Sequence, residues 1–401
     1  MINQPVKKLI TVMLLSNFCF LVNAKIQENT KPFQRLSAEA TEAEAKLSFR
    51  DLQSLDKAFI DTAPDERNDL ITVGKLSDDG RDKATIVKLA HQIAEGKHGK
   101  YDSLLIAHKG ELLFESYYLR GRSNMPHPQA SAVKGYTSLA LGRAIQMGYL
   151  TMADLDKPLV SFFNGLNPSK FVEGAEKITL HKALTMHGGL SVSDEKWQAL
   201  EQNPAVLQGQ GLVQALLEHS GPITAESQTY LYGNFNPILV MSVIDAVVPD
   251  TAKDFIKNEL LDKLSIKNYS WDTHISGLPQ AGWMVSLTSR DMLKLGNVVL
   301  NKGQWQGEQL ISAEYLAKAT SGLVKPTQDW MPKTYRYGYF WYQAPLAVGN
   351  EHYSASFAWG GGGQRVIVVD ELELTIVITA HDRDDKIMEQ ISKAVLPVFI
   401  E

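Results

Sequence analysis

Hydrophobic positions divide the chain into β-rich segments near both ends and a long helical stretch between them. Two apolar runs, 103–108 and 111–119, flank a glycine turn, which is typical of a hairpin. After Ser131, apolar residues recur with a period close to 3.6, which predicts a helix with one buried face. Helical patterns then dominate to about residue 320.

The pattern returns to strands towards the end of the chain. We expect strands over 335–342, 365–370 and 374–379, followed by a closing helix over 386–400 that Pro397 perturbs. Strands at both ends with helices between them assemble most simply as one sheet with an inserted helical subdomain. The pattern therefore predicts an α+β fold.

The first residues form a separate segment. Lys7 and Lys8 precede an apolar run over 9–22, which ends with small residues at the −3 and −1 positions of a cleavage site. This arrangement predicts a cleaved signal peptide over 1–24 and a periplasmic or secreted protein. A membrane anchor is the alternative, but spanning a bilayer takes about 20 apolar residues. The only cysteine, Cys19, lies in this segment, so the mature chain would contain no thiol.

Composition and charge narrow the range of partners. The 401 residues are 44% hydrophobic and 21% charged, as in ordinary globular proteins. The formal net charge of −5 becomes −7 once the two lysines of the signal segment are removed. An acidic protein without a dense basic stripe is not expected to bind nucleic acid. No later apolar run is long enough to cross a membrane, so none is expected after signal cleavage.

A Ser-x-x-Lys pattern supplies the first candidate chemistry. It occurs three times, at Ser54/Lys57, Ser131/Lys134 and Ser193/Lys196. Only Ser131 and Lys134 open an apolar helix, where residues three apart share a face. An amine in reach of a serine hydroxyl can act as its base, if burial lowers the lysine pKa from about 10.4. The alternative is that Ser131 starts the helix and Lys134 is solvated.

Two further motifs follow Ser-x-x-Lys along the chain. Tyr232 and Asn234 form the only Tyr-x-Asn, in which a phenol can relay a proton and an amide can orient a carbonyl. The alternative is a turn with a half-buried tyrosine. Trp359 then precedes four glycines, 360–363, directly before a strand. Because glycines cost backbone entropy, they indicate a close approach to the backbone by a substrate or a helix, or simply a tightly packed loop.

In this order, the three motifs resemble those of the serine β-lactamase-related family, which includes class C β-lactamases and penicillin-binding proteins. The chain looks most like the esterase and 6-aminohexanoate-dimer-hydrolase-like branch. The resemblance covers about residues 95–385 and extends to segments such as "SLLIAHKGELLFESYY" and "ITLHKALTMHGGL". It implies a β-lactamase/transpeptidase-like fold. This fold has an antiparallel sheet of about five strands flanked by helices, and a helical region across the active site.

The resemblance also implies roles for the motif residues. Ser131 would be the acylated nucleophile, Lys134 its base, and Tyr232 the proton relay. Asn234 would bind the amide on the acyl side of the substrate or help to hold Lys134. We expect an N-terminal extension over 25–95, whose role is open, and a hydrolase domain over 96–401 with its helical subdomain at about 150–300.

The third motif departs from that of the penicillin-recognising enzymes. Where they carry Lys-Thr-Gly, this chain has Trp359-Gly360-Gly361, which offers no charge for a substrate carboxylate. The resemblance places an oxyanion hole at the backbone N–H of Ser131 and one N–H near Trp359 or Gly360. Arg365 could supply a cation, but at the start of a strand we expect it to face the surface.

These observations predict a serine hydrolase that cleaves an ester or amide of a small molecule or peptide through an acyl-enzyme. No metal or cofactor is expected, because the donor residues over 380–385 are adjacent in one loop. One alternative is a weak β-lactamase or a D-amino-acid peptidase acting on cell-wall fragments. Another is a non-catalytic descendant that binds peptidoglycan or a partner protein.

Overall fold

The computed structural model describes residues 38–76, 83–383 and 386–400. The predicted signal segment over 1–24, with Cys19, lies outside the described residues. Ser37–Glu401 forms one compact unit.

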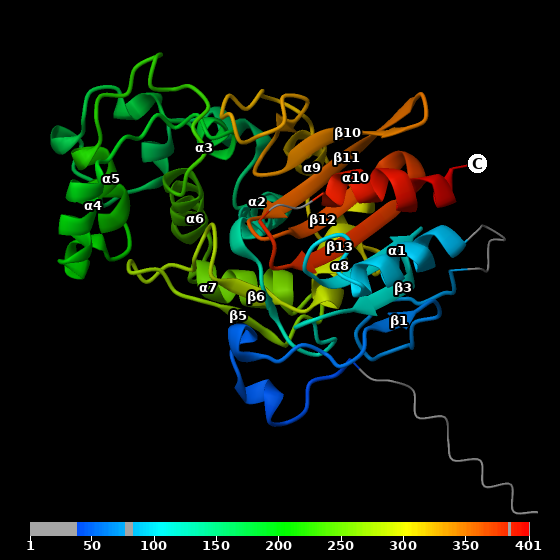
Figure 1. Ribbon diagram of the computed structural model, residues 1–401. Coiled ribbons are helices and arrows are strands. Elements are labelled where there is room, and N and C mark those ends of the chain that lie inside the picture. Colours follow the sequence, from blue (N-terminus) through cyan, green and yellow to red (C-terminus); the bar gives the residue numbers. More distant parts are fainter. Residues whose placement is uncertain (1–37, 77–82, 384–385, 401) are drawn as a thin grey trace, which may run out of the picture. The chain divides into compact units, whose positions relative to one another are not determined.

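An eight-stranded antiparallel sheet forms the centre of this unit, in the order β1-β3-β2-β13-β12-β11-β10-β9 (Figure 1). Its strands are β1 Phe59–Asp61, β2 Tyr101–His108, β3 Glu111–Tyr117, β9 Arg336–Tyr337, β10 Tyr342–Val348, β11 Glu351–Gly360, β12 Gln364–Val369 and β13 Leu374–Ala380. Both chain ends contribute, as expected, because β13 pairs with β2. The sheet is wider than about five strands, since β1 adds to one edge and β10 and β9 add to the other.

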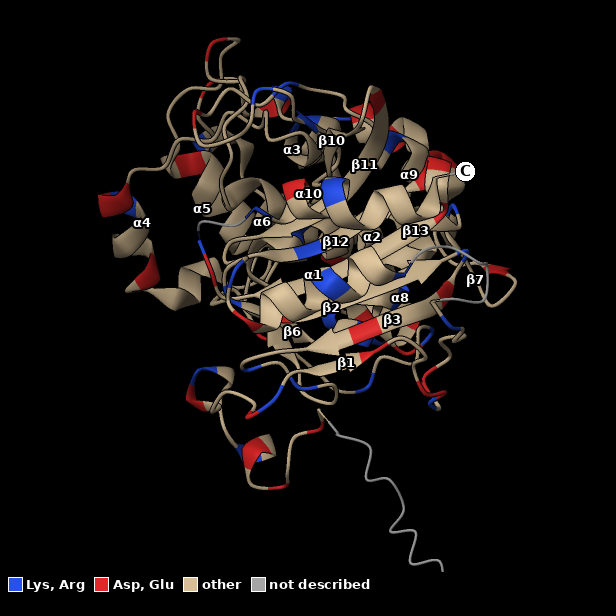
Figure 2. Ribbon diagram, turned by 45° about the vertical axis from the view of Figure 1, so that its right-hand side comes forward, with Lys and Arg blue, Asp and Glu red and all other residues tan. Residues whose placement is uncertain are grey.

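The central strands are buried on both faces. Every residue of β12 and β13 is buried, which explains their continuous apolar runs without alternation. Helix α8 packs against β12 and β13, and α1 and α10 cover the opposite face (Figure 2). Gly296 of α8 permits this contact, because a Cβ there would lie 2.4 Å from Thr375 Cγ2.

Ten α-helices surround the sheet in the part of the chain that the structure describes. They are α1 Ala84–Ala94, α2 Val133–Gln146, α3 Leu180–Leu184, α4 Asp194–Glu201, α5 Gly211–His219, α6 Phe235–Val247, α7 Ala252–Phe255, α8 Ser289–Leu300, α9 Ala313–Ala319 and α10 Ile387–Gln390. Helices α3–α7 lie together beside the sheet (green in Figure 1). Helix α8 belongs to the layer on the sheet, although it falls within the range 150–300 expected for the helical subdomain.

Short helical turns connect these elements. The 3₁₀ turns are η1 Glu44–Lys46, η2 Phe49–Asp51, η3 Ala130–Ala132, η4 Met152–Asp156, η5 Leu159–Phe162, η6 Pro168–Lys170, η7 Ala175–Lys177, η8 Pro204–Leu207, η10 Asp370–Leu372 and η12 Leu396–Phe399. Single π turns, η9 Ile256–Leu261 and η11 Ile391–Val395, extend α7 and α10. Within the described ranges no single helix is long and apolar enough to cross a membrane, and one pair bent by 90°, Phe235–Val247 with Ala252–Leu261, meets the length and composition test together.

The predicted strand over 335–342 is wrong in its middle. The strand β9 ends at Tyr337, the chain turns, and β10 begins at Tyr342. Gly338 lies so close to the C-terminus of α9 that a Cβ there would be 2.1 Å from the Ala319 carbonyl oxygen. Phe340 has a left-handed backbone, with φ of 64°. Packing against α9 therefore overrides the alternating pattern.

Two small sheets complete the fold. One joins β4 His127–Pro128, β6 Val285–Leu287 and β5 Tyr269–Trp271, and the other is the hairpin of β7 Gln304–Trp305 and β8 Glu308–Gln309. The first of them positions the site, because β4 leads directly into η3 and α2.

Candidate active site

Ser131 lies in the 3₁₀ turn η3, just before α2 begins. Its side chain caps neither helix, which removes the alternative that it merely starts one. The preceding Gln129 is fully buried and fixed, since its N–H donates to the Val285 carbonyl oxygen at 2.8 Å and its Oε1 accepts from the Tyr136 hydroxyl at 2.8 Å. Ala130 has φ of 46°, a left-handed conformation that costs about 1–2 kcal/mol. This rigid, strained turn presents the Ser131 hydroxyl.

Lys134 is only 1% exposed and lies beside that hydroxyl. Its Nζ is 3.2 Å from Ser131 Oγ, 3.0 Å from Asn234 Oδ1 and 3.3 Å from the Gly282 carbonyl oxygen. Burial lowers the pKa of the Lys134 amine below its ordinary value, and the nearby Tyr232 opposes this shift. The alternative of a solvated lysine is therefore excluded.

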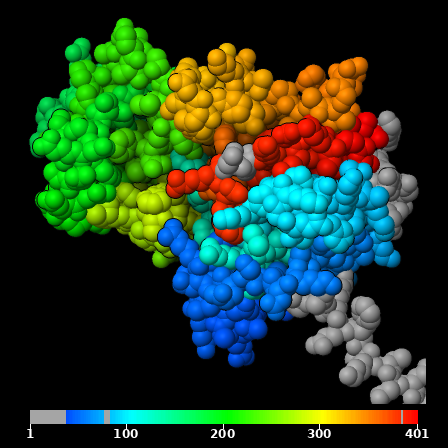
Figure 3. Space-filling model, in the orientation of Figure 1, coloured from blue at the N-terminus to red at the C-terminus, as the bar shows by residue number. Residues whose placement is uncertain are grey.

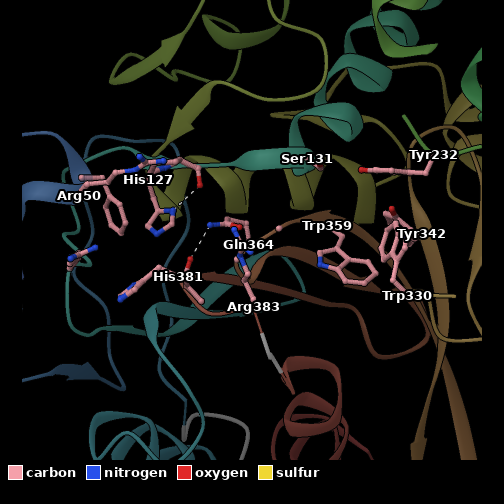
Figure 4. A pocket seen from close by; sticks show the side chains of 16 residues that line it. Arg50, His127, Ser131, Tyr232, Trp330, Tyr342, Trp359, Gln364, His381 and Arg383 are labelled. Atoms are coloured by element: carbon pink, nitrogen blue, oxygen red, sulfur yellow. Dashed lines mark hydrogen bonds between the residues drawn. The ribbon is translucent and has the colours of Figure 1, made fainter. Parts of the chain in front are cut away.

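Tyr232 completes the cluster from the segment before α6. Lys134 Nζ lies 4.9 Å from the centre of its ring, and its hydroxyl points towards Ser131 (Figure 4). The ring is held by edge-to-face contacts with Trp330 at 5.5 Å and with Tyr337 at 6.4 Å between ring centres. Burial raises the pKa of Tyr342 well above its ordinary value, and the neighbouring Tyr232 adds a smaller contribution in the same direction.

Asn234 contacts Lys134 and does not line the main cavity. Its Oδ1 accepts from Lys134 Nζ, and its side chain does not line the cavity that Ser131 lines. Gly282 completes the set, but no sequence pattern singles it out. A Cβ at Gly282 would lie 3.1 Å from Lys134 Nζ and 3.2 Å from Asn234 Oδ1, so a glycine leaves room for the lysine.

The glycine run combines three structural requirements. A Cβ at Gly360 would lie 2.3 Å from the Gln129 carbonyl oxygen, so the strand end packs directly on the serine-bearing turn. Gly362 and Gly363 have φ of 101° and 106°, which side chains rarely adopt. Gly361 has open space around it and lines the cavity. The glycine run therefore does allow a close approach to the backbone. At Gly360 the approaching group is the Gln129 carbonyl, in the chain segment just before Ser131.

Arg365 does not face the surface, so that prediction is wrong. It is 2% exposed, and its guanidinium carbon lies 4.4 Å from the centre of the Trp359 ring. Its Nη1 donates to the carbonyl oxygens of Gly360 and Gln364 at 3.3 and 3.0 Å. The guanidinium thus supports the ring from beneath by cation–π stacking and does not line the cavity.

A cavity of about 910 Å³ opens above these groups. The surface is hollowed where the helical region (green) meets the C-terminal part of the sheet (red; Figure 3). Near Ser131 the cavity is lined by aromatic rings from Tyr232, Trp330, Tyr342 and Trp359 (Figure 4). Trp330 is 54% exposed and comes from an irregular segment, and nothing in its sequence context indicated a role.

The other end of the cavity was also missed by sequence reasoning. It is lined by Phe49, Arg50, Arg120, His127, His381 and Arg383. Phe49 and Arg50 come from the N-terminal extension, whose role was open, and the Phe49 ring packs 4.1 Å from that of His127. These residues come from four separate segments, so no spacing rule could have joined them. Within the described residues, no group of three or more His, Cys, Asp or Glu could hold a metal ion.

Comparison with known proteins shows the family. A sequence model described as Beta-lactamase matches residues 90–395, more than half of the chain. Among curated proteins none matches the chain. Solved structures are similar over most of its length.

Three of these structures come from different bacteria. A penicillin-binding protein homologue from Caulobacter crescentus has a TM-score of 0.61 at 13% identity, covering 79% of this chain and 97% of its own. A D-stereospecific amidohydrolase from Streptomyces has a TM-score of 0.56 at 16% identity, and the match covers 77% of this chain and 97% of the amidohydrolase. A protein from Bacillus anthracis that is described as a 6-aminohexanoate-dimer hydrolase has a TM-score of 0.53 at 16% identity. The match covers 82% of this chain and 83% of that protein. At such identities the likeness establishes the fold. Together with the family match and the Ser131, Lys134 and Tyr232 cluster, it shows that the chain belongs to the beta-lactamase family of hydrolases.

Proposed function

We propose that this protein is a serine hydrolase that cleaves an ester or amide through an acyl-enzyme on Ser131. The observation that carries the proposal is the environment of Lys134. A neutral amine has two N–H bonds, and Asn234 Oδ1 and the Gly282 carbonyl oxygen accept both. The remaining lone pair then faces Ser131 Oγ at 3.2 Å, where it can accept the hydroxyl proton.

Acylation follows from this arrangement. Ser131 Oγ attacks the substrate carbonyl carbon as its proton passes to Lys134 Nζ. The backbone N–H of Ser131, with one from the segment 359–361, would stabilise the oxyanion. The proton then moves through the Tyr232 hydroxyl to the leaving oxygen or nitrogen, and the carbonyl–leaving group bond breaks. For deacylation, water attacks the acyl-enzyme, gives its proton to the same pair of groups, and Ser131 regains its hydroxyl.

The cavity around Ser131 favours a substrate whose reacting part is uncharged. Four aromatic rings surround the serine, and the nearest strand end carries Trp359 where penicillin-recognising relatives carry a lysine. Losing a charge-assisted hydrogen bond to a carboxylate there costs about 1.5–3 kcal/mol, or one to two orders of magnitude in preference for β-lactams. We therefore place esterase or amidase activity ahead of β-lactamase activity. The similar structures include an amidohydrolase and a 6-aminohexanoate-dimer hydrolase as well as class C β-lactamases, so they are compatible with either activity. We place the reaction in the periplasm or outside the cell, on the basis of the predicted signal peptide.

Labelling with a fluorophosphonate probe, together with turnover of p-nitrophenyl butyrate, tests the proposal. The Ser131→Ala variant should lose both labelling and turnover. Ser193→Ala is the matched control, because Ser193 belongs to another Ser-x-x-Lys pair but only caps α4 through the Lys196 N–H. The Ser193→Ala variant should retain both properties. Persistent labelling of Ser131→Ala would refute the assignment. Rapid turnover of a chromogenic cephalosporin with no turnover of esters would favour the β-lactamase alternative. Binding of cell-wall fragments without labelling would favour the non-catalytic one.

A further inference from the structure

The cavity has two ends of opposite chemistry. Its aromatic end surrounds Ser131, and Figure 4 shows Arg50 and His127 at the end away from these rings. The basic side chains that line the cavity are Arg50, Arg120, His127, His381 and Arg383. Among the described residues that line the cavity there is no aspartate or glutamate. A cavity with basic groups gathered at one end attracts a ligand that is negatively charged at the corresponding end.

The strand order sets the distance between the two ends. Gly361 follows β11, Gln364 begins β12, and His381 follows β13. Because these neighbouring strands are antiparallel, all three residues lie where the strands end on the same side of the sheet. Ser131 is held against the end of β11 through the contact between Gln129 and Gly360. Because neighbouring strands are about 4.8 Å apart, two strand spacings place His381, where the basic end begins, about 10 Å from the end of β11 that holds Ser131.

The three arginines of the basic end have no acidic partner among the described residues. In the part of the chain that the structure describes, no ion pair involves Arg50, Arg120 or Arg383. By contrast, the buried or half-buried Arg122 and Arg290 are paired with glutamates at 2.6 and 2.9 Å. Guanidinium groups bind carboxylates through paired, charge-assisted hydrogen bonds. Three of them around one end of a cavity thus form a ready site for an anion.

A buried carboxylate beneath this end does not cancel the charge. Asp102 is fully buried, and its Oδ2 accepts from His127 Nε2 at 3.1 Å and from His381 Nδ1 at 2.7 Å. His127 Nδ1 lies 2.9 Å from another acceptor, the Pro128 carbonyl oxygen. The Asp102 carboxylate is thus engaged by the two histidine rings, and the guanidinium groups of Arg50, Arg120 and Arg383 supply the charge of this end. His381 is fixed by the same carboxylate while its ring lines the cavity.

An unsatisfied acceptor lies between the two ends. Gln364 donates its Nε2 hydrogen to the Ala380 carbonyl oxygen at 2.9 Å, which fixes the orientation of the amide. Its Oε1 is buried and has no hydrogen-bond partner among the described residues. Leaving a buried acceptor unpaired costs about 1–3 kcal/mol. Gln364 lines the cavity between the two ends, but this Oε1 is shielded from solvent and does not face a ligand there.

We propose that the cavity selects esters or amides that carry a carboxylate or similar anionic group about 10 Å from the reacting carbonyl, bound by Arg50, Arg120 and Arg383. This inference rests on the proposed function and adds the substrate class to it. The aromatic rings hold the uncharged part at Ser131, and the basic end sets both the charge and the length of the substrate.

Matched chromogenic esters test both charge and length. The mono-p-nitrophenyl ester of suberic acid carries a distal carboxylate that an extended chain brings to the basic end, and its methyl-capped form is neutral. At low ionic strength we expect kcat/KM for the acid to exceed that for the capped ester by about 10-fold or more, the effect of one charge-assisted hydrogen bond. The corresponding succinate pair should show no such preference, because its chain is too short. A second series, with the acid on the alcohol side of the ester, covers the other orientation.

Variants of the basic end provide the second arm. Arg120→Gln and Arg383→Gln should each reduce the ratio of acid to capped-ester kcat/KM by about 5- to 10-fold. Arg336→Gln is the control, since Arg336 is exposed on β9 and does not line the cavity, and it should keep the wild-type ratio. Thermal unfolding of each variant separates loss of the subsite from loss of the fold.

The possible failures can be told apart. Equal turnover of acid and capped esters in both series would overturn this inference and leave the hydrolase proposal intact. If the fluorophosphonate probe did not label Ser131 and neither esters nor amides were cleaved, the proposed function would fail. Binding of suberate and dimethyl suberate, followed by the fluorescence of Trp330 and Trp359, would then decide the subsite. Tighter binding of suberate would then support the subsite, and equal binding would refute it.

Discussion

Gly282 offers the sharpest test of how the lysine is positioned. In the Gly282→Ala variant, the new Cβ would lie 3.1 Å from Lys134 Nζ and 3.2 Å from Asn234 Oδ1. Both distances are shorter than an ordinary contact, so Nζ has to move by a few tenths of an ångström. The end of the lysine can move at little cost to the fold, whereas the proton transfer that we propose from Ser131 to Lys134 depends on the position of Nζ.

The expected loss of activity follows from that displacement. Since a misplacement of about 1 Å costs roughly 100-fold in rate, a shift of a few tenths of an ångström should lower kcat/KM by about 5- to 10-fold. Stability should change little, because the gain of about 0.4–1 kcal/mol from replacing a glycine offsets the local crowding. Hydrolysis of p-nitrophenyl butyrate and thermal unfolding measure the two effects separately.

Gly221→Ala is the matched control for this substitution. A Cβ at Gly221 meets Ser191 only at 4.0 Å, an ordinary contact, and Gly221 does not line the cavity. This variant should match the wild type in both assays. If Gly282→Ala also kept the wild-type kcat/KM, the position of Lys134 Nζ would not limit the reaction, and the reasoning would be refuted.

Three further predictions concern charge. Asn234→Asp places a carboxylate beside Lys134, which raises the lysine pKa, so the acidic limb of the kcat/KM profile should move to higher pH by about one unit or more; an unchanged profile would contradict Lys134 as the base. Glu115→Ala removes the two-oxygen partner of the buried Arg290 guanidinium, which keeps only its ion pair with Asp69 at 3.1 Å, and should cost about 3 kcal/mol in the free energy of unfolding, measured in urea. Burial would raise the pKa of Asp102, but its two histidine hydrogen bonds prevail and hold it below 3.8; replacing Asp102 by alanine should therefore cost about 2–3 kcal/mol at pH 7, and this difference should shrink as the pH falls below 3.8.

Most helices and strands could be predicted from short patterns in the sequence. The helical patterns expected up to about residue 320 include α8, whose start is capped by the Thr288 hydroxyl, which accepts from the Asp291 N–H at 3.1 Å. The apolar runs 365–370 and 374–379 became β12 and β13. Such features depend on residues a few positions apart, which the sequence displays directly. The strand over 335–342 failed because the packing of Gly338 on α9 depends on residues outside the segment.

Part of the candidate site could be predicted from the sequence for the same reason. Ser131 and Lys134 lie three residues apart on one turn, so their contact is local, and Tyr232 was chosen for its chemistry and its motif. The prediction for Arg365 was wrong, since a charged side chain at a strand end is usually exposed. Its burial depends on the Trp359 ring beside it and on the carbonyl oxygens that accept from its guanidinium. Gly282 carries no chemistry of its own, and its role lies in the space it leaves empty.

The sequence by itself therefore determined the α+β class, the family resemblance and the candidate reacting groups, because periodicity and short motifs are properties of neighbouring residues. The tertiary structure alone decided that Asn234 and Gly282 aim Lys134 and that Trp330 joins the aromatic end. It also brought Arg50 of the extension to the same cavity. These contacts join positions separated by tens to hundreds of residues, and only the packing of the helical region and the N-terminal segment around the end of the sheet brings them together.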